Sequence, residues 1–421
     1  MPAPTGLDHL RVMQKAATYP NAAVSELFEQ YGELFAFGFG DIRFHWLVGA
    51  EGLRFILEQP EYFRLRRAYG FLYPIVGDFA LITSDEPGHL ERRRQVQPAF
   101  HAKQVAGWLE LSEAKAALFA ARPETTFDLY AALKPHVLAL ICELLLGSDV
   151  LARRPGLLAD IGKMMAYANL PFLAQQIKLA LPFTPWHRFL AARRRVDAVL
   201  TEEIAFKRSA EADESVLGLL LAQNPESSTK LLRDSALSLV SAGFDTTSAA
   251  LTWTVYLLLK HPGTLYDLQT ELAGLDARAA LKAPLLDAVV KETLRLYPSA
   301  PAGLRETAMP LAYKGYHIPA NSLLAYSITL TQRQESYFED ALSFKPERWF
   351  GGFQPVPFSY APFGYGARYC IGARLADLII KTHLHALLKH KLKAAWTMPV
   401  EETGNTVHPK GGLPVQLGSK L

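Results

Sequence analysis

The segment from Pro362 to Ile380 constrains this chain most, because it places one cysteine, Cys370, in a glycine-rich loop immediately before a predicted helix. The helix is indicated by apolar residues at i, i+4, i+7 and i+8, namely Ile371, Leu375, Leu378 and Ile379. A sulfur atom near a helix N-terminus lies at the positive end of the helix dipole, which favours a thiolate over a thiol. We therefore interpret Cys370 as a metal ligand.

The loop around Cys370 also suits close contact with a flat group. Gly364, Gly366 and Gly372 allow the backbone to approach closely and to adopt dihedral angles that a side chain would forbid. Arg368, two residues before the sulfur, is placed to pair with an anion beside the ligand. The alternative is a small buried cysteine under a glycine-rich turn, which is the usual role of a lone intracellular cysteine.

Five positions in this segment match the Phe-x-x-Gly-x-Arg-x-Cys-x-Gly signature: Phe363, Gly366, Arg368, Cys370 and Gly372. The chain therefore resembles the cytochrome P450 haem-thiolate monooxygenases. The resemblance implies a mainly α fold with a smaller β region, in which a helix-rich prism surrounds a buried haem. It also implies that all five residues contact haem b and that the Cys370 thiolate ligates the iron, where it favours O–O cleavage.

Composition and charge limit the class of protein. With 421 residues, half of them apolar, the chain can bury a large core. Its 44 basic and 41 acidic side chains give a formal net charge of +3, too balanced to indicate nucleic-acid binding. The resemblance covers the chain from about residue 30 and implies one cytochrome P450 domain over residues 1–421, with its β-rich part at about 25–80 and 305–330.

The cysteine count and the N-terminal residues bear on localisation. Two cysteines cannot form a disulfide framework, and Cys142 lies in an apolar run where it is expected to fill the core. Without a cysteine-rich pattern or a signal peptide, we expect the reducing cytoplasm. Asp8, Arg11 and Lys15 interrupt the N-terminal residues, so a span of roughly 20 apolar residues cannot form there. A soluble monomer without a transmembrane anchor is expected.

The N-terminal part predicts a hairpin between helices. A helix is expected over 21–33, strands over Leu34–Phe39 and Ile42–Val48 with a turn at Gly40-Asp41, and a helix over Ala50–Glu58. The stretch from Tyr62 to Leu81 mixes arginines with aromatic residues, and the spacing of its apolar residues fits neither a helix nor a strand. It is either a loop that lines an apolar space or a mobile surface loop.

His89 and Arg93 stand four residues apart on one face of a predicted helix, where both can reach the same anion. The resemblance assigns both residues to a haem propionate. Arg92, Arg94 and Lys103 are expected to face outward. Near the thiolate side of a haem, such a basic patch would steer an acidic electron donor.

Residues 104 to 222 predict successive helices. The polar joints between them are expected at 121–123, 153–155 and 210–214. The apolar, proline-containing segments Met164–Leu173 and Leu179–Trp186 suit a protein core. By analogy with the family they would instead form a flap over the substrate channel, which indicates a lipophilic substrate or transient membrane contact.

One long helix is predicted from Thr229 to Lys260. Asp245 near its middle argues against exposure to lipid, because an ionisable group there needs a partner. Around it, the run from Ala242 to Thr247 is a poor helix sequence, since glycine costs about 1 kcal/mol relative to alanine and threonine hydroxyls compete for backbone carbonyls. Such a cost calls for a physical reason.

We interpret Ala242 and Gly243 as making room for dioxygen, and Asp245 and Thr246 as a proton path, because reductive cleavage of O₂ consumes two protons. A helix kink or N-cap is the alternative. The run also matches the family's Ala/Gly-Gly-x-Asp/Glu-Thr-Thr motif. The resemblance thus makes Asp245 the acid and Thr246 the hydroxyl that organises the oxygen.

Glu292 and Arg295 lie at i, i+3 on the predicted helix from Leu285 to Tyr297, ordinarily a surface pair of little energetic value. They match the family's Glu-x-x-Arg motif, whose partner would be Arg348. A buried set of one glutamate and two arginines is a poor source of stability, because desolvation offsets the attraction. We interpret the three as holding the loop of Cys370.

The remaining C-terminal segments predict a small sheet and a pocket wall. Ser299–Leu304 supplies small apolar residues for the wall, and Arg305 is a second candidate to bind a propionate. Strands are expected over Thr307–Pro319 and Leu323–Ile328, and a hairpin at Gly411–Pro414. Where many relatives have His-Arg-Asp-Pro, this chain has Gln-Arg-Gln-Glu from Gln332 onward.

The function predicted is insertion of one atom of O₂ into a C–H bond of a lipophilic carotenoid, terpenoid or fatty-acid-like substrate. Electrons would come from NAD(P)H through separate proteins, because this chain has no flavin, ferredoxin or dinucleotide motif. The resemblance implies a ferredoxin and its reductase, or an equivalent electron donor. The alternatives are a peroxide-driven peroxygenase, a hydroperoxide isomerase, a non-catalytic haem-binding protein and an integral membrane protein.

Overall fold

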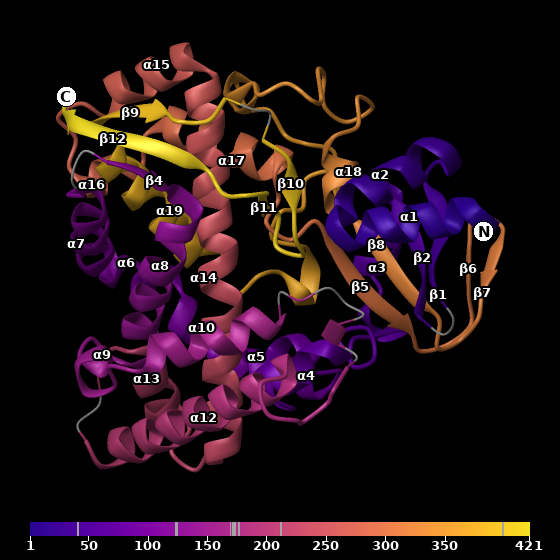
Figure 1. Cartoon of the computed structure of the whole chain (residues 1–421), viewed down its shortest axis with the longest axis horizontal. Helices are drawn as coiled ribbons and strands as arrows, with labels where there is room; N and C mark the ends of the chain where they lie inside the picture. Colours follow the sequence, from indigo (N-terminus) through magenta and orange to yellow (C-terminus); the bar gives the residue numbers. More distant parts are fainter. Residues whose placement is uncertain are drawn as a thin grey trace. The chain divides into compact units, whose positions relative to one another are not determined.

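The computed structural model describes residues 1–39, 42–122, 125–168, 170, 174–175, 177–210, 213–397 and 400–421. They form two compact units, in which helices predominate (Figure 1). The first unit consists of Met1–Arg64, Ala106–Leu133 and Thr246–Leu421, and the second of Leu65–Val105 and Lys134–Asp245. The single domain over residues 1–421 stays a prediction. The expected turn at Gly40-Asp41 lies outside the described residues.

The first unit contains a five-stranded sheet that brings distant segments together (Figure 1). Its strands, in spatial order, are β1 (Leu34–Phe39), β2 (Ile42–Val48), β8 (Leu323–Ser327), β5 (Ala302–Thr307) and β3 (Phe63–Arg64). β2 and β8 run parallel, and the other neighbours are antiparallel. The predicted strands β1 and β2 are confirmed with the same bounds, whereas β5 was not predicted and includes the second half of the expected pocket wall, residues 302–304.

Three further small sheets lie in the first unit. They pair β6 (Leu311–Tyr313) with β7 (Tyr316–Ile318), β10 (Glu402–Thr403) with β11 (His408–Pro409), and β12 (Pro414–Lys420) with both β4 (Thr126–Asp128) and β9 (His390–Ala394). The β6–β7 pair falls within the predicted segment Thr307–Pro319. The hairpin expected at Gly411–Pro414 is wrong, because β12 begins at Pro414 and pairs with strands distant in sequence.

Several helices lie wholly in the first unit, among them the helix that carries Glu292 and Arg295 and the helix that follows the loop of Cys370. They are α1 (Gly6–Thr18), α2 (Pro20–Tyr31), α3 (Ala50–Leu57), α7 (Leu109–Ala120), α15 (Pro262–Leu272), α16 (Ala277–Ala280), α17 (Pro284–Leu296), α18 (Ile328–Gln332) and α19 (Ala373–Leu387). α2, α15 and α17 each begin with proline, whose fixed φ suits the first helical position and whose missing N–H costs nothing there. Buried Ser112 of α7 and Thr382 of α19 share a hydrogen bond of 2.7 Å between their hydroxyls.

The second unit is helical. It contains α4 (Tyr73–Val76), α5 (Gly88–Val96), α9 (Val150–Arg153), α10 (Leu157–Ala168), α12 (Pro185–Ser209) and α13 (Val216–Gln223). α6 (Ala102–Gly107), α8 (Leu129–Leu146) and α14 (Thr229–Lys260) contribute residues to both units. The predicted bounds of α14 are confirmed. The helices also end at the expected joints, of which residues 123 and 211–212 lie outside the described residues, as do 169 and 171–173 of the proposed flap.

Within the described residues, only α8 is long and apolar enough to meet a test for membrane spans. In its most apolar window, 67% of the residues are buried inside the protein, and core helices of soluble proteins pass the same test. α8 is therefore weak evidence for a membrane span.

Candidate functional site

The loop before α19 is held in shape by its own backbone. The amide of Cys370 donates to the carbonyl of Phe363 at 2.8 Å, and the amide of Gly364 donates to the carbonyl of Ala361 at 3.0 Å. Gly366 has a φ of +63°, and a Cβ there would lie 3.2 Å from the carbonyl oxygen of Leu57. Glycine is needed at this position because any side chain would be both strained and crowded.

The two cysteines differ in their environments. Cys370 is exposed and lies three residues before the first residue of α19, whose N-cap is Gly372. Cys142 is fully buried in α8, and burial raises the pKa of its thiol to about 12. A buried thiol that keeps its proton is a poor ligand, whereas the exposed sulfur of Cys370 lies at the positive end of α19.

Two other signature residues lie close to Cys370. The ring of Phe363 lies 6.3 Å from that of Tyr369, and Arg368 ends a short 3₁₀ turn in the same loop. At Gly372 an added Cβ would meet no protein atom within 4 Å, so the loop leaves space beside the cysteine. All five signature residues therefore belong to one compact loop of the first unit.

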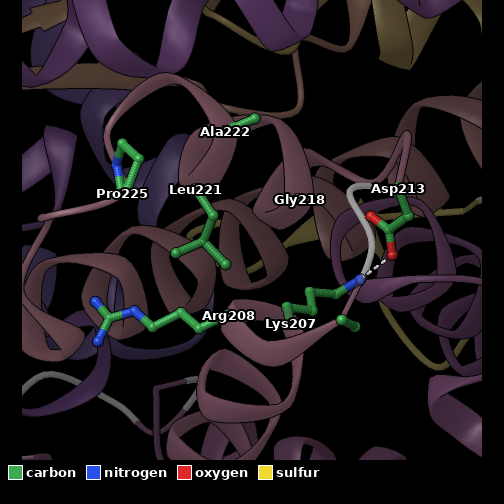
Figure 2. A pocket seen from close by; sticks show the side chains of 8 residues that line it. Lys207, Arg208, Asp213, Gly218, Leu221, Ala222 and Pro225 are labelled. Atoms are coloured by element: carbon green, nitrogen blue, oxygen red, sulfur yellow. Dashed lines mark hydrogen bonds and ion pairs between the residues drawn. The ribbon is translucent and has the colours of Figure 1, made fainter.

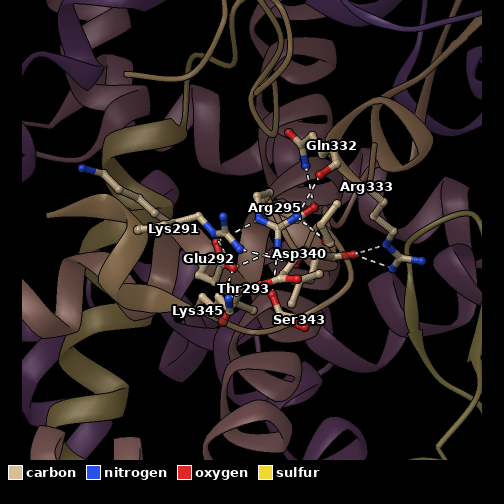
Figure 3. A network of polar contacts seen from close by, with 12 residues as sticks. Lys291, Glu292, Thr293, Arg295, Gln332, Arg333, Asp340, Ser343 and Lys345 are labelled. Atoms are coloured by element: carbon tan, nitrogen blue, oxygen red, sulfur yellow. Dashed lines mark hydrogen bonds and ion pairs between the residues drawn. The ribbon is translucent and has the colours of Figure 1, made fainter. Parts of the chain in front are cut away.

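The Glu-x-x-Arg residues and Arg348 meet around one buried carboxylate. Nε and Nη2 of Arg295 donate to the two carboxylate oxygens of Glu292 at 2.9 and 2.8 Å, and Nε of Arg348 donates to Oε1 at 3.0 Å. The side chains of Glu292 and Arg295 have no exposed surface. Figure 3 shows Arg295 facing Glu292. We call these three residues the glutamate cluster.

Sequence reasoning missed two further donors to Glu292. The indole N–H of Trp349 donates to Oε2 at 2.9 Å, and the amide of Lys345 donates to Oε1 at 3.0 Å. Arg295 also donates to the carbonyls of Gln332, Ala341 and Ser343. Trp349 could have been found from its position directly after Arg348, because an indole N–H needs a hydrogen-bond partner when buried. Together these donors compensate the negative charge of the buried Glu292 carboxylate.

The residues predicted to bind a propionate lie in both units. In the second unit, His89 and Arg93 are on α5; His89 is 2% exposed, and its Nδ1 lies 2.8 Å from Oε1 of Glu86. In the first unit, Arg305 is on β5, buried, with its guanidinium 5.5 Å from the ring centre of Tyr326. The structure places each of them on a regular element.

The basic residues near α5 differ in exposure. Arg94 and Lys103 are exposed, as expected. Arg92 is not fully outward: its guanidinium lies 5.0 Å from the ring centre of Phe79 and donates to the hydroxyl of Ser84. The expectation that Arg92 faces solvent is therefore wrong, because its side chain folds back onto an aromatic ring.

Asp245 of α14 is 5% exposed, and its Oδ1 lies 2.9 Å from Nζ of Lys134 on α8. The sequence indicated that this buried carboxylate needs a partner but could not identify Lys134, more than a hundred positions away. Thr246 follows Asp245 on α14, and its carbonyl accepts a hydrogen bond of 2.7 Å from the hydroxyl of Ser299. Asp245 and Thr246 occupy consecutive positions of α14, and their role in a proton path stays a prediction.

The glycine in the middle of α14 packs close to a side chain of α8. A Cβ on Gly243 would lie 2.8 Å from Cδ1 of Ile141, so the end of the Ile141 side chain would have to shift. Ala242 beside it is exposed. The role of Ala242 and Gly243 in oxygen binding stays a prediction.

A cavity of about 180 Å³ lies between α12 and α13 in the second unit, and none of its lining residues is a predicted site residue (Figure 2). Its lining includes Lys207, Arg208, Asp213 and Leu221, and Lys207 forms an ion pair with Asp213. This pair leaves the cation of Arg208 in the lining. It contributes nothing to the site described above.

The residues present fit a haem with a sulfur ligand. In the first unit, Cys370 is exposed just before the N-terminus of α19, Gly372 leaves open space beside it, and Arg305 is a candidate to pair with a carboxylate. The roles of His89 and Arg93, which lie in the second unit, stay predictions. When bound, such a group supplies the binding and reductive activation of O₂. The fold and this loop together define a haem-thiolate oxygenase.

Comparison with known proteins gives the family. The cytochrome P450 family model matches residues 4–398. Cytochrome P450 139 of Mycobacterium tuberculosis is 30% identical over 405 residues, covering 91% of this chain and 93% of that protein. Rat mitochondrial 25-hydroxyvitamin D-1 alpha hydroxylase is 38% identical over 181 residues, or 40% of this chain and 36% of that protein. This chain belongs to the cytochrome P450 family.

A solved structure supports the fold independently. Cyanobacterial CYP120A1 with bound retinoic acid has a TM-score of 0.88 and covers 100% of this chain and 99% of its own, at 24% identity. The predicted fold class is therefore confirmed. The protein is a haem monooxygenase with a cysteine-ligated haem, and it works with O₂, an organic substrate and electron-transfer partners.

Proposed function

We propose that this enzyme inserts one atom of O₂ into a C–H bond of a lipophilic organic substrate, with Cys370 as the iron ligand. The observation that carries the assignment is the contrast between the cysteines: Cys370 is exposed in the signature loop, whereas Cys142 is buried with its pKa raised to about 12. Phe363, Gly366, Arg368 and Gly372 line the cofactor beside Cys370, while His89, Arg93 and Arg305 bind its propionates.

In this proposal Asp245 and Thr246 would relay protons, taken up from water, toward the place where the haem would hold O₂. The carboxylate of Asp245 is buried beside the ammonium of Lys134, which holds it in place on α14. The hydroxyl of Thr246, on the next residue, receives the proton and passes it on. A carboxylate and a hydroxyl on consecutive positions support turnover with O₂ and a reductant over turnover with peroxide.

The substrate proposed is a carotenoid, a terpenoid or a fatty-acid-like molecule. A structure with the same fold was solved with retinoic acid, and a relative is named for hydroxylation of 25-hydroxyvitamin D. Both names refer to large lipophilic molecules. The aromatic residues Tyr69, Phe71 and Tyr73 in the stretch 62–81 support an apolar lining, and the rings of Tyr69 and Phe71 lie 6.2 Å apart.

A titration tests the substrate class. Retinoids, carotenoids, terpenoids and long-chain fatty acids are added to the purified haem-loaded protein while its Soret band is followed. A substrate of the proposed class displaces the axial water and shifts the iron toward high spin at micromolar concentration. If only small polar compounds cause the shift, the lipophilic assignment is wrong. Product formation with peroxide but not with electron donors would instead favour a peroxygenase.

The electron donor proposed is an acidic ferredoxin, reduced by NAD(P)H through its reductase. Arg94 on α5 and Lys103 on α6 are exposed cations that suit an acidic partner. Charge reversal at both positions, Arg94→Glu with Lys103→Glu, should slow reduction by an acidic ferredoxin and weaken its salt dependence. Unchanged reduction kinetics would place the partner elsewhere.

The localisation proposed is cytoplasmic with transient membrane contact. Ile177, Leu179, Leu181 and Phe183 are all exposed, Phe183 by 82%. The hydroxyl of Thr184 donates to the carbonyls of Leu179 and Leu181 at 2.6 and 2.8 Å, so the segment 177–183 has a defined turn. No acidic residue occurs between Asp160 and Asp197, while Lys and Arg recur there. A basic segment with exposed apolar side chains suits an anionic lipid surface.

A further inference from the structure

Gln332 ends α18 and is fully buried, at the position where this chain departs from the His-Arg-Asp-Pro pattern of many relatives. Its side-chain amide nitrogen donates to the carbonyls of Leu294 and Arg295, both at 2.9 Å. Its side-chain oxygen accepts from the amide of Ala361 at 2.7 Å. One neutral side chain thus satisfies three buried backbone groups.

Ala361 is the first residue of a series of backbone hydrogen bonds that leads to Cys370. Its carbonyl accepts from the amide of Gly364 at 3.0 Å, which closes the first turn of the loop. The carbonyl of Phe363, inside that turn, accepts from the amide of Cys370 at 2.8 Å. The amide that Gln332 holds is therefore linked to Cys370 through two backbone hydrogen bonds.

The other end of Gln332 joins the glutamate cluster. Nη1 of Arg295 donates to the backbone carbonyl of Gln332 at 2.9 Å, while the side chain of Gln332 donates to the backbone carbonyl of Arg295. Gln332 and Arg295 are therefore joined by two hydrogen bonds, and Figure 3 shows them side by side. Arg295 also donates a hydrogen bond to Glu292.

We propose that Gln332 is a positioning residue that transmits the geometry of the glutamate cluster to the loop of Cys370, and so sets the environment of the thiolate. The inference rests on the proposed ligation by Cys370. Glutamine suits this position because it combines two donors with an acceptor. Histidine offers one of each, and glutamate would face the two carbonyls without a donor.

Three variants test the role. Gln332→Met keeps the volume and removes all three side-chain hydrogen bonds. Gln332→His can restore the acceptor for Ala361. Gln334→Leu is the matched control, because Gln334 lies on the same segment and its side-chain oxygen accepts only a 3.4 Å bond from Ser336 in the described part of the chain.

The readouts follow the thiolate and the loop. In Gln332→Met we expect a several-fold larger fraction of reduced, carbon-monoxide-treated protein without the thiolate absorption band, and a changed reduction potential. Hydrogen exchange in the peptide around Ala361 should accelerate about tenfold or more, because a buried N–H loses its acceptor. Gln332→His should recover part of each effect, and Gln334→Leu should match the wild type.

The proposal is wrong if Gln332→Met only unfolds at lower temperature while its spectrum, potential and exchange near Ala361 match the control. If Gln332→Met does not fold, the comparison of Gln332→His with Gln334→Leu decides by the same three readouts. Absence of the thiolate band in the wild type would refute ligation by Cys370 instead, so the two failures are distinguishable.

Discussion

The indole N–H of Trp349 donates to Oε2 of Glu292 across 2.9 Å, so an aromatic residue of the segment after β8 helps to neutralise a fully buried carboxylate of α17. With Arg295, Arg348 and the amide of Lys345, it completes the shell of donors around Glu292. This shell ties α17 to the segment 345–349, and through Gln332 to the loop of Cys370.

Glu292→Ala should leave the buried Arg295 and the partly buried Arg348 without their carboxylate. Breaking one partner of such a set costs about 3–5 kcal/mol, so we expect protein that is mostly unfolded or free of haem. Trp349→Phe keeps an aromatic side chain, although a smaller one, and removes one donor, which should cost about 1–3 kcal/mol. Chemical denaturation and haem content measure both effects. A stable, haem-loaded Glu292→Ala protein would contradict the scaffold role.

Thr246→Ala removes the hydroxyl next to Asp245 on α14. We expect substrate binding to persist while electrons are consumed without product, because protons no longer reach the oxygen in order. The ratio of product to NAD(P)H consumed should fall several-fold, with peroxide or water formed instead. Thr247→Ala, at the neighbouring hydroxyl, is the control. Unchanged coupling in Thr246→Ala would refute the proton path.

His383 of α19 should make the protein sensitive to acid. Burial lowers its pKa to about 4, although the hydrogen bond to the carbonyl of Ile379 acts in the opposite direction. The unfolded chain has a histidine pKa of about 6.5, so it binds the proton first as the pH falls. Stability is therefore lost between about pH 6.5 and pH 4, by about 3 kcal/mol at most.

His383→Gln should flatten that part of the stability curve, as measured by urea denaturation at a series of pH values. His101→Gln, at an exposed position, is the control and should leave the curve unchanged. An unaltered slope between pH 6.5 and pH 4 in His383→Gln would show that other groups dominate the acid response.

The segment 177–183 should bind anionic lipid. We expect co-sedimentation with vesicles rich in phosphatidylglycerol but not with pure phosphatidylcholine vesicles. Leu181→Ser with Phe183→Ser should weaken binding at least tenfold, since each buried apolar side chain contributes about 1.5–3 kcal/mol. Leu342→Ser, which changes a leucine of the first unit that is more exposed than Leu181, serves as the control. Equal binding of both variants would refute the membrane contact.

Local signals explain what the sequence could predict. The bounds of α14 follow from hydroxyl residues at its start and Pro262 after its end, and β1 and β2 follow from two apolar runs around a turn. The pairing of β4, β9 and β12 could not be predicted, because short strands far apart in sequence meet only in the fold.

Within the candidate site, motifs identified residue types but not their partners. The pairing of Glu292 with Arg295 follows from helix spacing. The partners Lys134 and Trp349 depend on tertiary contacts that no local pattern encodes. The contact of Ile141 with Gly243 also depends on tertiary packing that no local pattern encodes.

The measurement that tests the central claim most directly is the absorption spectrum of the reduced protein treated with carbon monoxide, compared among wild type, Cys370→Ser and Cys142→Ser. The account predicts the strongly red-shifted band of an anionic sulfur ligand in the wild type and in Cys142→Ser, and its loss in Cys370→Ser. Retention of the band in Cys370→Ser, or its absence from the wild type, would contradict ligation of the iron by Cys370.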